Sequence, residues 1–195
     1  IIKKKPKNLI LLEKDLSLFN FLKKKYQINK NIKIINIDAL EYDFSNLNKI
    51  KIISNLPYNI STKIIIKLLF YNKNIKSLTC MIQKELADKF NYNKKNMNKY
   101  KFIIQMCSEY KILFNVSNKV FYPKPKVQST LVIFKLKNNQ IDKDKLLNYT
   151  NKIFSNKRKS LRNKLKNTSF NNKIILSKRV QDLNFDELLE IYKFF

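Results

Sequence analysis

The sequence predicts an α/β domain followed by a small all-helical C-terminal domain. In the first half of the 195 residues, short apolar runs alternate with helical patterns, which is typical of βαβ units around a largely parallel sheet. After Asn138 and Asn139 the pattern becomes helical throughout. Hydrophobic residues make up 44% of the chain, enough to form a core. We therefore place the α/β domain at residues 1–138 and the helical domain at residues 139–195.

Three early strands are predicted at residues 8–13, 32–38 and 50–55, and they end in Glu13, Asp38 and Asn55. Asp15 is placed to cap a helix that carries Leu16, Phe19 and Leu22 on one face. In open α/β sheets the ligand lies outside the carboxyl ends of the strands, so we expect the three polar ends to meet at one edge. Acidic groups there suit a ribose or an amine; the alternative is that they simply face solvent.

Later elements follow from the same patterns. Ser61 and Thr62 are placed to cap a helix, and the further elements are a strand at 78–82, helices at 84–90 and 99–108, and strands at 110–116 and 127–137. Pro123-Lys124-Pro125 must form a turn outside the sheet. In the C-terminal part, the spacing of Leu146-Leu147, Ile153-Phe154, Leu161 and Leu165 predicts packed helical faces.

Composition excludes several kinds of site. The sequence has no histidine, so a Cys/His zinc site and a His-based catalytic triad are excluded, and we expect no metal. It has no glycine, so a GxGxxG dinucleotide loop and a P-loop are excluded within it. Cys80 and Cys107 lie far apart, and we interpret them as buried structural thiols.

The charge points to a polyanionic partner. The chain has 41 Lys+Arg against 14 Asp+Glu, a net charge of +27. Residues with A/T-rich codons are abundant, which indicates a small A+T-rich genome such as that of an endosymbiont or an organelle. Part of the lysine excess then reflects drift and serves only solubility. No apolar run approaches the ~18–20 residues that span a bilayer, and we expect a cytoplasmic bacterial protein that does not enter membranes, an organelle being the alternative.

The motif with most chemical content is Asn55-Leu56-Pro57-Tyr58, at the end of a predicted strand. A carboxamide, a carbonyl before a proline ring and an aromatic ring can together hold a flat base and accept hydrogen bonds from its exocyclic amine. The alternative is an ordinary turn that contains a tyrosine.

Five segments resemble the ribosomal RNA adenine dimethyltransferases, the KsgA family, which are related to the Erm methyltransferases. They are residues 55–62, 81–89, 120–129, 154–165 and 178–183, in family order, and the resemblance runs from Asn8 to the last residue. It implies a Rossmann-like class I methyltransferase sheet that is incomplete at the N-terminus, because family members carry a first strand and a glycine-rich cofactor loop upstream. Ile37 stands where the family usually has glycine, and Gln128 where it usually has aspartate.

The resemblance implies that S-adenosylmethionine supplies two methyl groups to the exocyclic amine of each of two adjacent adenosines in small-subunit (16S-type) rRNA. Asn55 and the Leu56 carbonyl would accept hydrogen bonds from that amine, with Pro57 shaping the turn. Tyr58 would stack on the adenine and Phe121 would cover its other face. For the cofactor, Glu13 would bind the ribose, Asp38 and Ala39 the adenine, and Asn55 would border the site. The implied partner is the immature small ribosomal subunit, and we expect the protein to bind it as a monomer.

All three arginines, Arg158, Arg162 and Arg179, lie in the predicted helical domain. Arg158 and Arg162 are four residues apart, which predicts one helix face, with Lys159 and Lys166 nearby. Arginine makes planar bidentate contacts to phosphate, so these five residues are the candidate rRNA contacts. The alternatives are an arginine that caps a carbonyl or pairs with Asp182. The Lys/Asn-rich loop at residues 91–101 is either a further RNA contact or a solvated loop.

Two functions therefore remain open at the level of the sequence. The first is an rRNA adenine dimethyltransferase that is complete only with upstream sequence. The second is an RNA-binding ribosome-assembly factor that keeps the fold and has lost cofactor binding. A transcription-factor role, as in mitochondrial relatives, ranks third.

Overall fold

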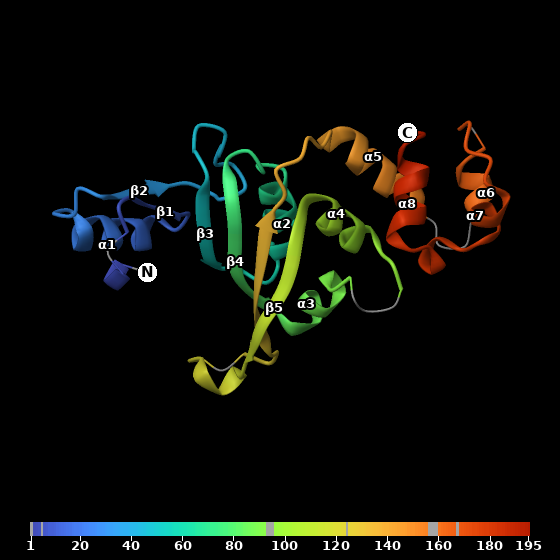
Figure 1. Ribbon diagram of the computed structural model, residues 1–195. Helices are drawn as coiled ribbons and strands as arrows, with labels where there is room; N and C mark the ends of the chain where they lie inside the picture. The colour runs from blue at the N-terminus through green and yellow to red at the C-terminus, as the bar shows by residue number, and fades with distance from the viewer. Residues whose placement is uncertain (1, 5, 93–95, 124, 156–159, 167) are drawn as a thin grey trace. The chain divides into compact units, whose positions relative to one another are not determined.

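A computed structural model describes the chain except at residues 1, 5, 93–95, 124, 156–159 and 167 (Figure 1). The chain divides into two compact units, Ile1–Asn46 and Leu47–Phe195, and each is described by itself. In the part of the chain that the structure describes, no helix is long and apolar enough to cross a membrane.

The first unit is a single βαβ arrangement. Its elements are the 3-10 turn η1 (Ile2–Lys4), strand β1 (Leu9–Glu13), helix α1 (Leu16–Tyr26) and strand β2 (Ile32–Asn36), with β1 and β2 parallel. Asp15 is the N-cap of α1, as predicted, and its carboxylate accepts a hydrogen bond from the Leu18 N–H at 2.8 Å. Phe19 and Leu22 are half-buried, but Leu16 is 61% exposed. The predicted apolar face is wrong at Leu16, because a side chain at the first helical residue points back past the helix end.

The second unit contains a four-stranded sheet with three helices. Its elements are β3 (Ile50–Asn55), α2 (Ser61–Leu69), β4 (Ile75–Gln83), α3 (Lys84–Phe90), α4 (Lys99–Cys107), β5 (Ser108–Val116), η2 (Asn118–Val120) and β6 (Ser129–Leu136). The strand order is β3-β4-β6-β5. β3, β4 and β5 run in the same direction, and β6 lies antiparallel between β4 and β5. The parallel pairing expected for the early strands is confirmed for β1 with β2 and for β3 with β4, and the antiparallel β6 makes the sheet of this unit mixed.

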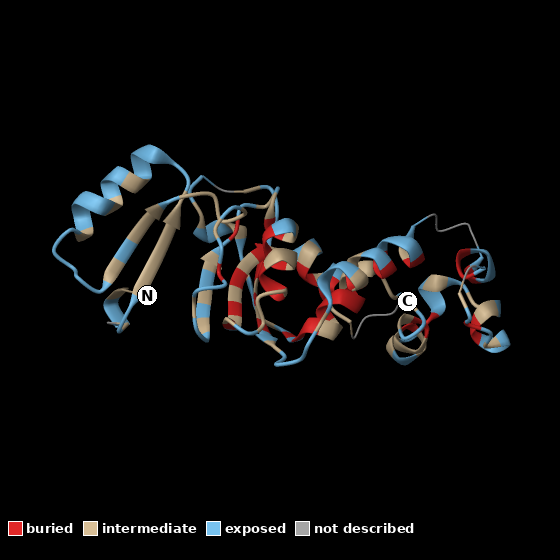
Figure 2. Cartoon of the chain, turned by 90° about the horizontal axis from the view of Figure 1, so that it is seen from above, coloured by how far each residue is buried: buried red, intermediate tan, exposed pale blue. Residues whose placement is uncertain are grey.

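The core of this sheet lies against α2, α3 and α4, which contact its strands on one side (Figure 1). Side chains alternate along β4, with Leu78, Cys80 and Ile82 fully buried, and the buried positions cluster where sheet and helices meet (Figure 2). Cys80 and Cys107 are buried free thiols, as predicted, and burial raises the pKa of each to about 12. Neither thiol is therefore ionised at neutral pH.

The C-terminal part of the second unit is helical, as predicted. It comprises α5 (Lys143–Phe154), α6 (Leu161–Lys164), α7 (Lys173–Ser177), η3 (Val180–Asp182) and α8 (Phe185–Tyr192). The Phe102 ring of α4 packs on the rings of Tyr149 and Phe185, with both centroid separations at 5.4 Å. The helical segment and α4 therefore share aromatic packing, and the predicted boundary between residues 138 and 139 stays a prediction.

Among the described residues, two take up left-handed backbone conformations that usually favour glycine. They are Lys49, with φ 46°, and Asn96, with φ 69°. Asparagine tolerates this region better than other non-glycine residues, whereas a lysine there costs ~1–2 kcal/mol. The glycine-free sequence therefore retains tight turns at a cost in stability.

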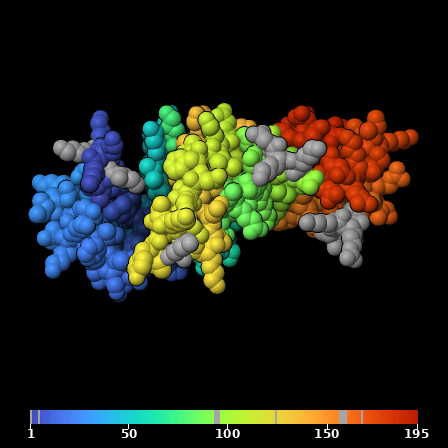
Figure 3. All heavy atoms as spheres, turned by 90° about the horizontal axis from the view of Figure 1, so that it is seen from below, coloured from blue at the N-terminus to red at the C-terminus, as the bar shows by residue number. Residues whose placement is uncertain are grey.

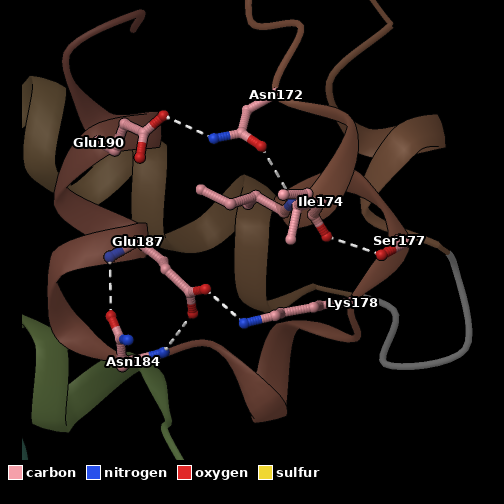
Figure 4. A network of polar contacts seen from close by, with 8 residues as sticks. Asn172, Ile174, Ser177, Lys178, Asn184, Glu187 and Glu190 are labelled. Atoms are coloured by element: carbon pink, nitrogen blue, oxygen red, sulfur yellow. Dashed lines mark hydrogen bonds and ion pairs between the residues drawn. The ribbon is translucent and has the colours of Figure 1, made fainter.

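A polar network orders α7, η3 and α8 (Figure 4). The Asn184 side chain accepts from the Glu187 N–H at 2.9 Å, and the Glu187 carboxylate accepts from the Asn184 N–H at 2.9 Å, which is a capping box. Lys178 forms an ion pair with the same carboxylate. Burial alone would raise the pKa of Glu187, but the hydrogen bonds from Lys178 and the Asn184 backbone, together with the Lys178 charge, lower it.

This depressed pKa makes the stability of the helical segment sensitive to acid. A carboxyl group whose pKa is lower in the folded than in the unfolded chain stabilises the fold above the unfolded pKa, ordinarily near 4.5, and loses that contribution as pH falls through the folded pKa. We expect Glu187→Gln to cost about 1 kcal/mol at pH 7 and to flatten the loss of stability below pH ~4.5. Urea unfolding at pH 7 and pH 3 measures both effects; an equal cost at the two values would contradict the assignment.

Candidate active site

The segment after β3 lines a pocket of about 400 Å³ in the second unit. The lining residues are Asn55, Leu56, Pro57, Tyr58, Phe121, Tyr122, Pro123 and Pro125. The five residues that the sequence predicted for catalysis thus come together, although Phe121 is far from the others along the chain. The connection between β5 and β6, which supplies the second half of the lining, extends past the end of the sheet (Figure 1) and forms exposed surface (Figure 3, yellow).

Hydrogen bonds hold the turn after β3 in place. The Leu56 N–H donates to the Met81 carbonyl at 3.3 Å, and the Leu56 side chain is buried. The Ser61 hydroxyl is fully buried and donates to the Pro57 carbonyl at 2.7 Å. The N-cap of α2 is Ile60, without a side-chain cap bond, so the predicted capping role of Ser61 is wrong. Its hydroxyl instead donates to the carbonyls of Pro57 and Tyr58 and so holds the turn after β3 against the start of α2.

The Tyr58 ring is oriented by a hydrogen bond from its hydroxyl group. Tyr58 Oη lies 2.7 Å from Ser129 Oγ at the start of β6, and Ser129 is fully buried. The bond ties the turn after β3 to the first residue of β6. We expect Tyr58→Phe, which keeps the ring, to lower the free energy of unfolding by about 1 kcal/mol. Urea denaturation measures this, and Tyr26→Phe, at a half-buried tyrosine of the first unit, is the matched control.

The two expected acceptors are available for a ligand. Within the described part of the chain, no donor reaches the Asn55 carboxamide or the Leu56 carbonyl, and Asn55 is exposed. Beside them the pocket offers the faces of Tyr58 and Phe121. Two acceptors next to aromatic rings suit a planar ring that bears an amino group.

Tyr122, Pro123 and Pro125 also line the pocket, and the sequence did not single them out for the site. Tyr122 is fully exposed and adds a third aromatic ring. Their position in the segment 120–129, which also contains Phe121, is the feature of the sequence that could have indicated a place in this pocket.

The first unit holds the predicted cofactor residues Glu13, Asp38 and Ala39. Because β1 and β2 are parallel with Glu13 opposite Asn36, Glu13 and Asp38 lie at the same end of this sheet. Glu13 Oε1 accepts from the Asp15 N–H at 2.9 Å. Asp38 accepts from Lys14 Nζ and the Leu40 N–H, both at 2.8 Å. The hydrogen bond and charge of Asp38 raise the pKa of Lys14.

Ile37, which stands where the family usually has glycine, does not have a positive φ. Its backbone conformation is therefore one that isoleucine adopts without strain. Asn55 belongs to the second unit, so the common edge of Glu13, Asp38 and Asn55 stays a prediction.

The candidate RNA contacts lie in the helical segment. Arg162, Lys166 and Arg179 are exposed, whereas Arg158 and Lys159 lie outside the described residues. Ser160 is the N-cap of α6 in an extended conformation (ψ 152°), so α6 begins at Leu161. The prediction that Arg158 and Arg162 share one helix face stays a prediction, because Arg158 lies outside the described residues and the described helix begins at Leu161.

Comparison with known proteins identifies the family. A family model described as "Ribosomal RNA adenine dimethylase" matches residues 1–195. The chain belongs to this family.

Relatives in the family include "Ribosomal RNA small subunit methyltransferase A" of Malacoplasma penetrans, which is 44% identical over 174 residues, covering 86% of this chain and 62% of the relative. The protein of the same name from Hydrogenobaculum is 34% identical, covering 98% of this chain and 75% of the relative. The chain thus spans less than two thirds of the Malacoplasma protein.

Solved structures show the fold. A dimethyladenosine transferase from Plasmodium falciparum superposes with a TM-score of 0.77 at 23% identity, covering 95% of this chain and 80% of that one. The 23S rRNA methyltransferase ErmE gives 0.75 at 18% identity, covering 97% and 82%. The chain therefore has the Rossmann-like α/β fold of class I methyltransferases.

Proposed function

We propose that this chain carries the target-base pocket of an enzyme that dimethylates the exocyclic amine of two adjacent adenosines in small-subunit rRNA. The observation that carries the proposal is the pocket of Asn55, Leu56, Tyr58 and Phe121, in a chain that belongs to the rRNA adenine dimethylase family. Relatives named for small-subunit methyl transfer support the choice of substrate. The proposed partner is the immature small ribosomal subunit. We propose that the protein binds it as a monomer in the bacterial cytoplasm.

The residues act on the amine by positioning it. The Asn55 carboxamide oxygen and the Leu56 carbonyl accept its two N–H groups, which directs the nitrogen lone pair away from them. Tyr58, held by Ser129, and Phe121 stack on the extruded base and repay part of its unstacking, at roughly 1–3 kcal/mol per stacked base. Such positioning needs no strong base, which agrees with a sequence without histidine.

S-adenosylmethionine is the proposed methyl donor, and the first unit offers a donor set that fits it. The carboxylates of Glu13 and Asp38 stand at the same end of β1 and β2, where they suit ribose hydroxyls and an adenine amine. When bound, the cofactor supplies an electrophilic methyl group. Glu13, Asp38 and Ala39 would hold its adenosine part, and Asn55 would border its reactive end.

The experiment that tests this function is methyl transfer to small ribosomal subunits prepared without adenine methylation. Labelled S-adenosylmethionine is incubated with the chain and the particles, and the digested rRNA is analysed for N6,N6-dimethyladenosine. Label in that nucleoside supports the proposal. Particle binding without cofactor binding or label would favour the assembly-factor alternative, which the net charge of +27 also accommodates.

Exposed arginines of the helical segment are proposed to contact rRNA phosphates. When a protein side chain neutralises an RNA phosphate, a counterion is released from the RNA, so the binding affinity falls as the salt concentration rises. For single strands, the slope of log K against log salt concentration is about −0.7 per phosphate contact. We expect Arg162→Gln and Arg179→Gln each to weaken particle binding and to reduce the magnitude of the salt slope by about 0.7. Filter binding between 50 and 300 mM salt measures this. Lys193→Gln, at an exposed lysine of the same unit, is the control, and an equal change in that variant would count against specific contacts.

A further inference from the structure

A second pocket, of about 330 Å³, lies in the same unit. It is lined by Gln83, Lys84, Glu85, Asp88, Val127 and Gln128, none of which lines the adenosine pocket. The adenosine pocket is the pocket around Asn55, Tyr58 and Phe121 described above, and the second pocket is similar to it in volume. No step of the proposed methyl transfer uses the second pocket.

The same loop lines both pockets. Phe121 and Pro125 line the adenosine pocket, Val127 and Gln128 line the second, and the next residue, Ser129, holds the Tyr58 hydroxyl. Across the β4–β6 ladder, Ser129 pairs with Gln83 of the second pocket. The two pockets therefore lie on either side of one short stretch of chain, between Pro125 and Val127, so adjacent nucleotides of one strand are the natural candidates to occupy them.

The lining of the second pocket suits a base better than a phosphate. Lys84 carries one positive charge, and Glu85 and Asp88 carry two negative charges, so the pocket is acidic in a chain of net charge +27. Lys84 Nζ donates to Gln128 Oε1 at 3.3 Å, and the Lys84 N–H donates to the Gln128 carbonyl at 2.9 Å, which fixes the pocket wall. Carboxylates and carboxamides accept hydrogen bonds from amino groups, and Val127, 39% exposed, offers an apolar contact.

We infer that this second pocket binds the base of the nucleotide next to the target adenosine and recognises its exocyclic amino group. The inference rests on the proposed function, in which the neighbour is the other adenosine. Dimethylation removes both N–H groups from that amine, so the pocket binds an unmodified neighbour more tightly than a dimethylated one. The pocket thereby makes the two modifications interdependent.

Fluorescence anisotropy with short RNA probes tests this on the chain itself, without a methylation step. The probes are UUAAUU and versions in which one or both adenosines are replaced by uridine, by an abasic site or by N6,N6-dimethyladenosine. We expect about 10-fold tighter binding of UUAAUU than of any singly altered probe. Glu85→Ala, which removes the acceptor, should reduce this ratio to about twofold, whereas Glu109→Ala, at an exposed position on β5 that lines neither pocket, should leave it unchanged.

The outcomes separate this inference from the proposed function. Equal binding of UUAAUU and the singly altered probes, with weaker binding only when both adenosines are replaced, would overturn the second pocket and leave the adenosine pocket standing. Binding that ignores both replacements would overturn both. Abasic probes that bind as well as UUAAUU, with all probes weakened alike by Lys84→Gln, would replace the base contact by a phosphate contact.

Discussion

Replacing Asn55 by alanine should lower the rate of methyl transfer about 100-fold. The carboxamide is one of two acceptors that align the target amine, and a reacting atom displaced by about 1 Å can cost 10²-fold in rate. Asn55 is exposed, and within the described residues its side chain has no hydrogen-bond partner, so the variant should fold as the parent does. Single-turnover transfer to unmethylated small subunits measures the rate, and equilibrium binding of S-adenosylmethionine, measured in parallel, separates alignment of the amine from loss of the cofactor.

Asn59→Ala is the matched control, because Asn59 is an exposed asparagine of the same turn region that does not line the pocket. It should retain the parental rate. A loss below threefold in Asn55→Ala, or the same loss in both variants, would show that the carboxamide does not position the amine.

Local patterns predicted the first half of this site. The apolar run that becomes β3, followed by the proline that ends it, placed Asn55 at a strand terminus, and the helix at residues 84–90 was predicted with the bounds that α3 has. Such features depend on neighbouring residues. Phe121 was reached only through family resemblance, since it lies far from Asn55 along the chain and no local pattern links the two residues.

Other features arise from tertiary contacts that a local pattern does not contain. The antiparallel placement of β6 between β4 and β5 depends on strand pairing across distant segments. Lys164 would ordinarily be placed in solvent, yet it is 8% exposed, and its ammonium donates to the carbonyls of Ile153 and Ser155 at the end of α5. Carbonyl groups at the end of a helix have no N–H donor from a following turn of that helix. Lys164 of α6 supplies a donor to these two carbonyls from another part of the chain.

The largest effect on stability is expected at Tyr149, at the centre of the helical segment. Its ring is fully buried against Tyr192 and Phe195, at centroid distances of 5.1 and 4.9 Å, and its hydroxyl donates to the Leu188 carbonyl at 2.6 Å. Tyr149→Ala should lower the free energy of unfolding by about 4 kcal/mol, from the cavity and the unpaired carbonyl. Tyr149→Phe should cost about 1–2 kcal/mol. Tyr122→Ala, at a fully exposed ring, should change it by less than about 0.5 kcal/mol.

Urea unfolding of these variants also tests the proposed domain boundary between residues 138 and 139. Phe102 of α4 packs on Tyr149, so a cavity at Tyr149 removes contacts on both sides of that boundary. If the helical segment folds as a domain of its own, Tyr149→Ala should produce an early transition in far-ultraviolet circular dichroism, while methyl-donor binding persists to higher urea. If the shared aromatic packing couples them, both signals should shift together to lower urea, and residues 139–195 would then be part of the methyltransferase domain rather than an appendage to it.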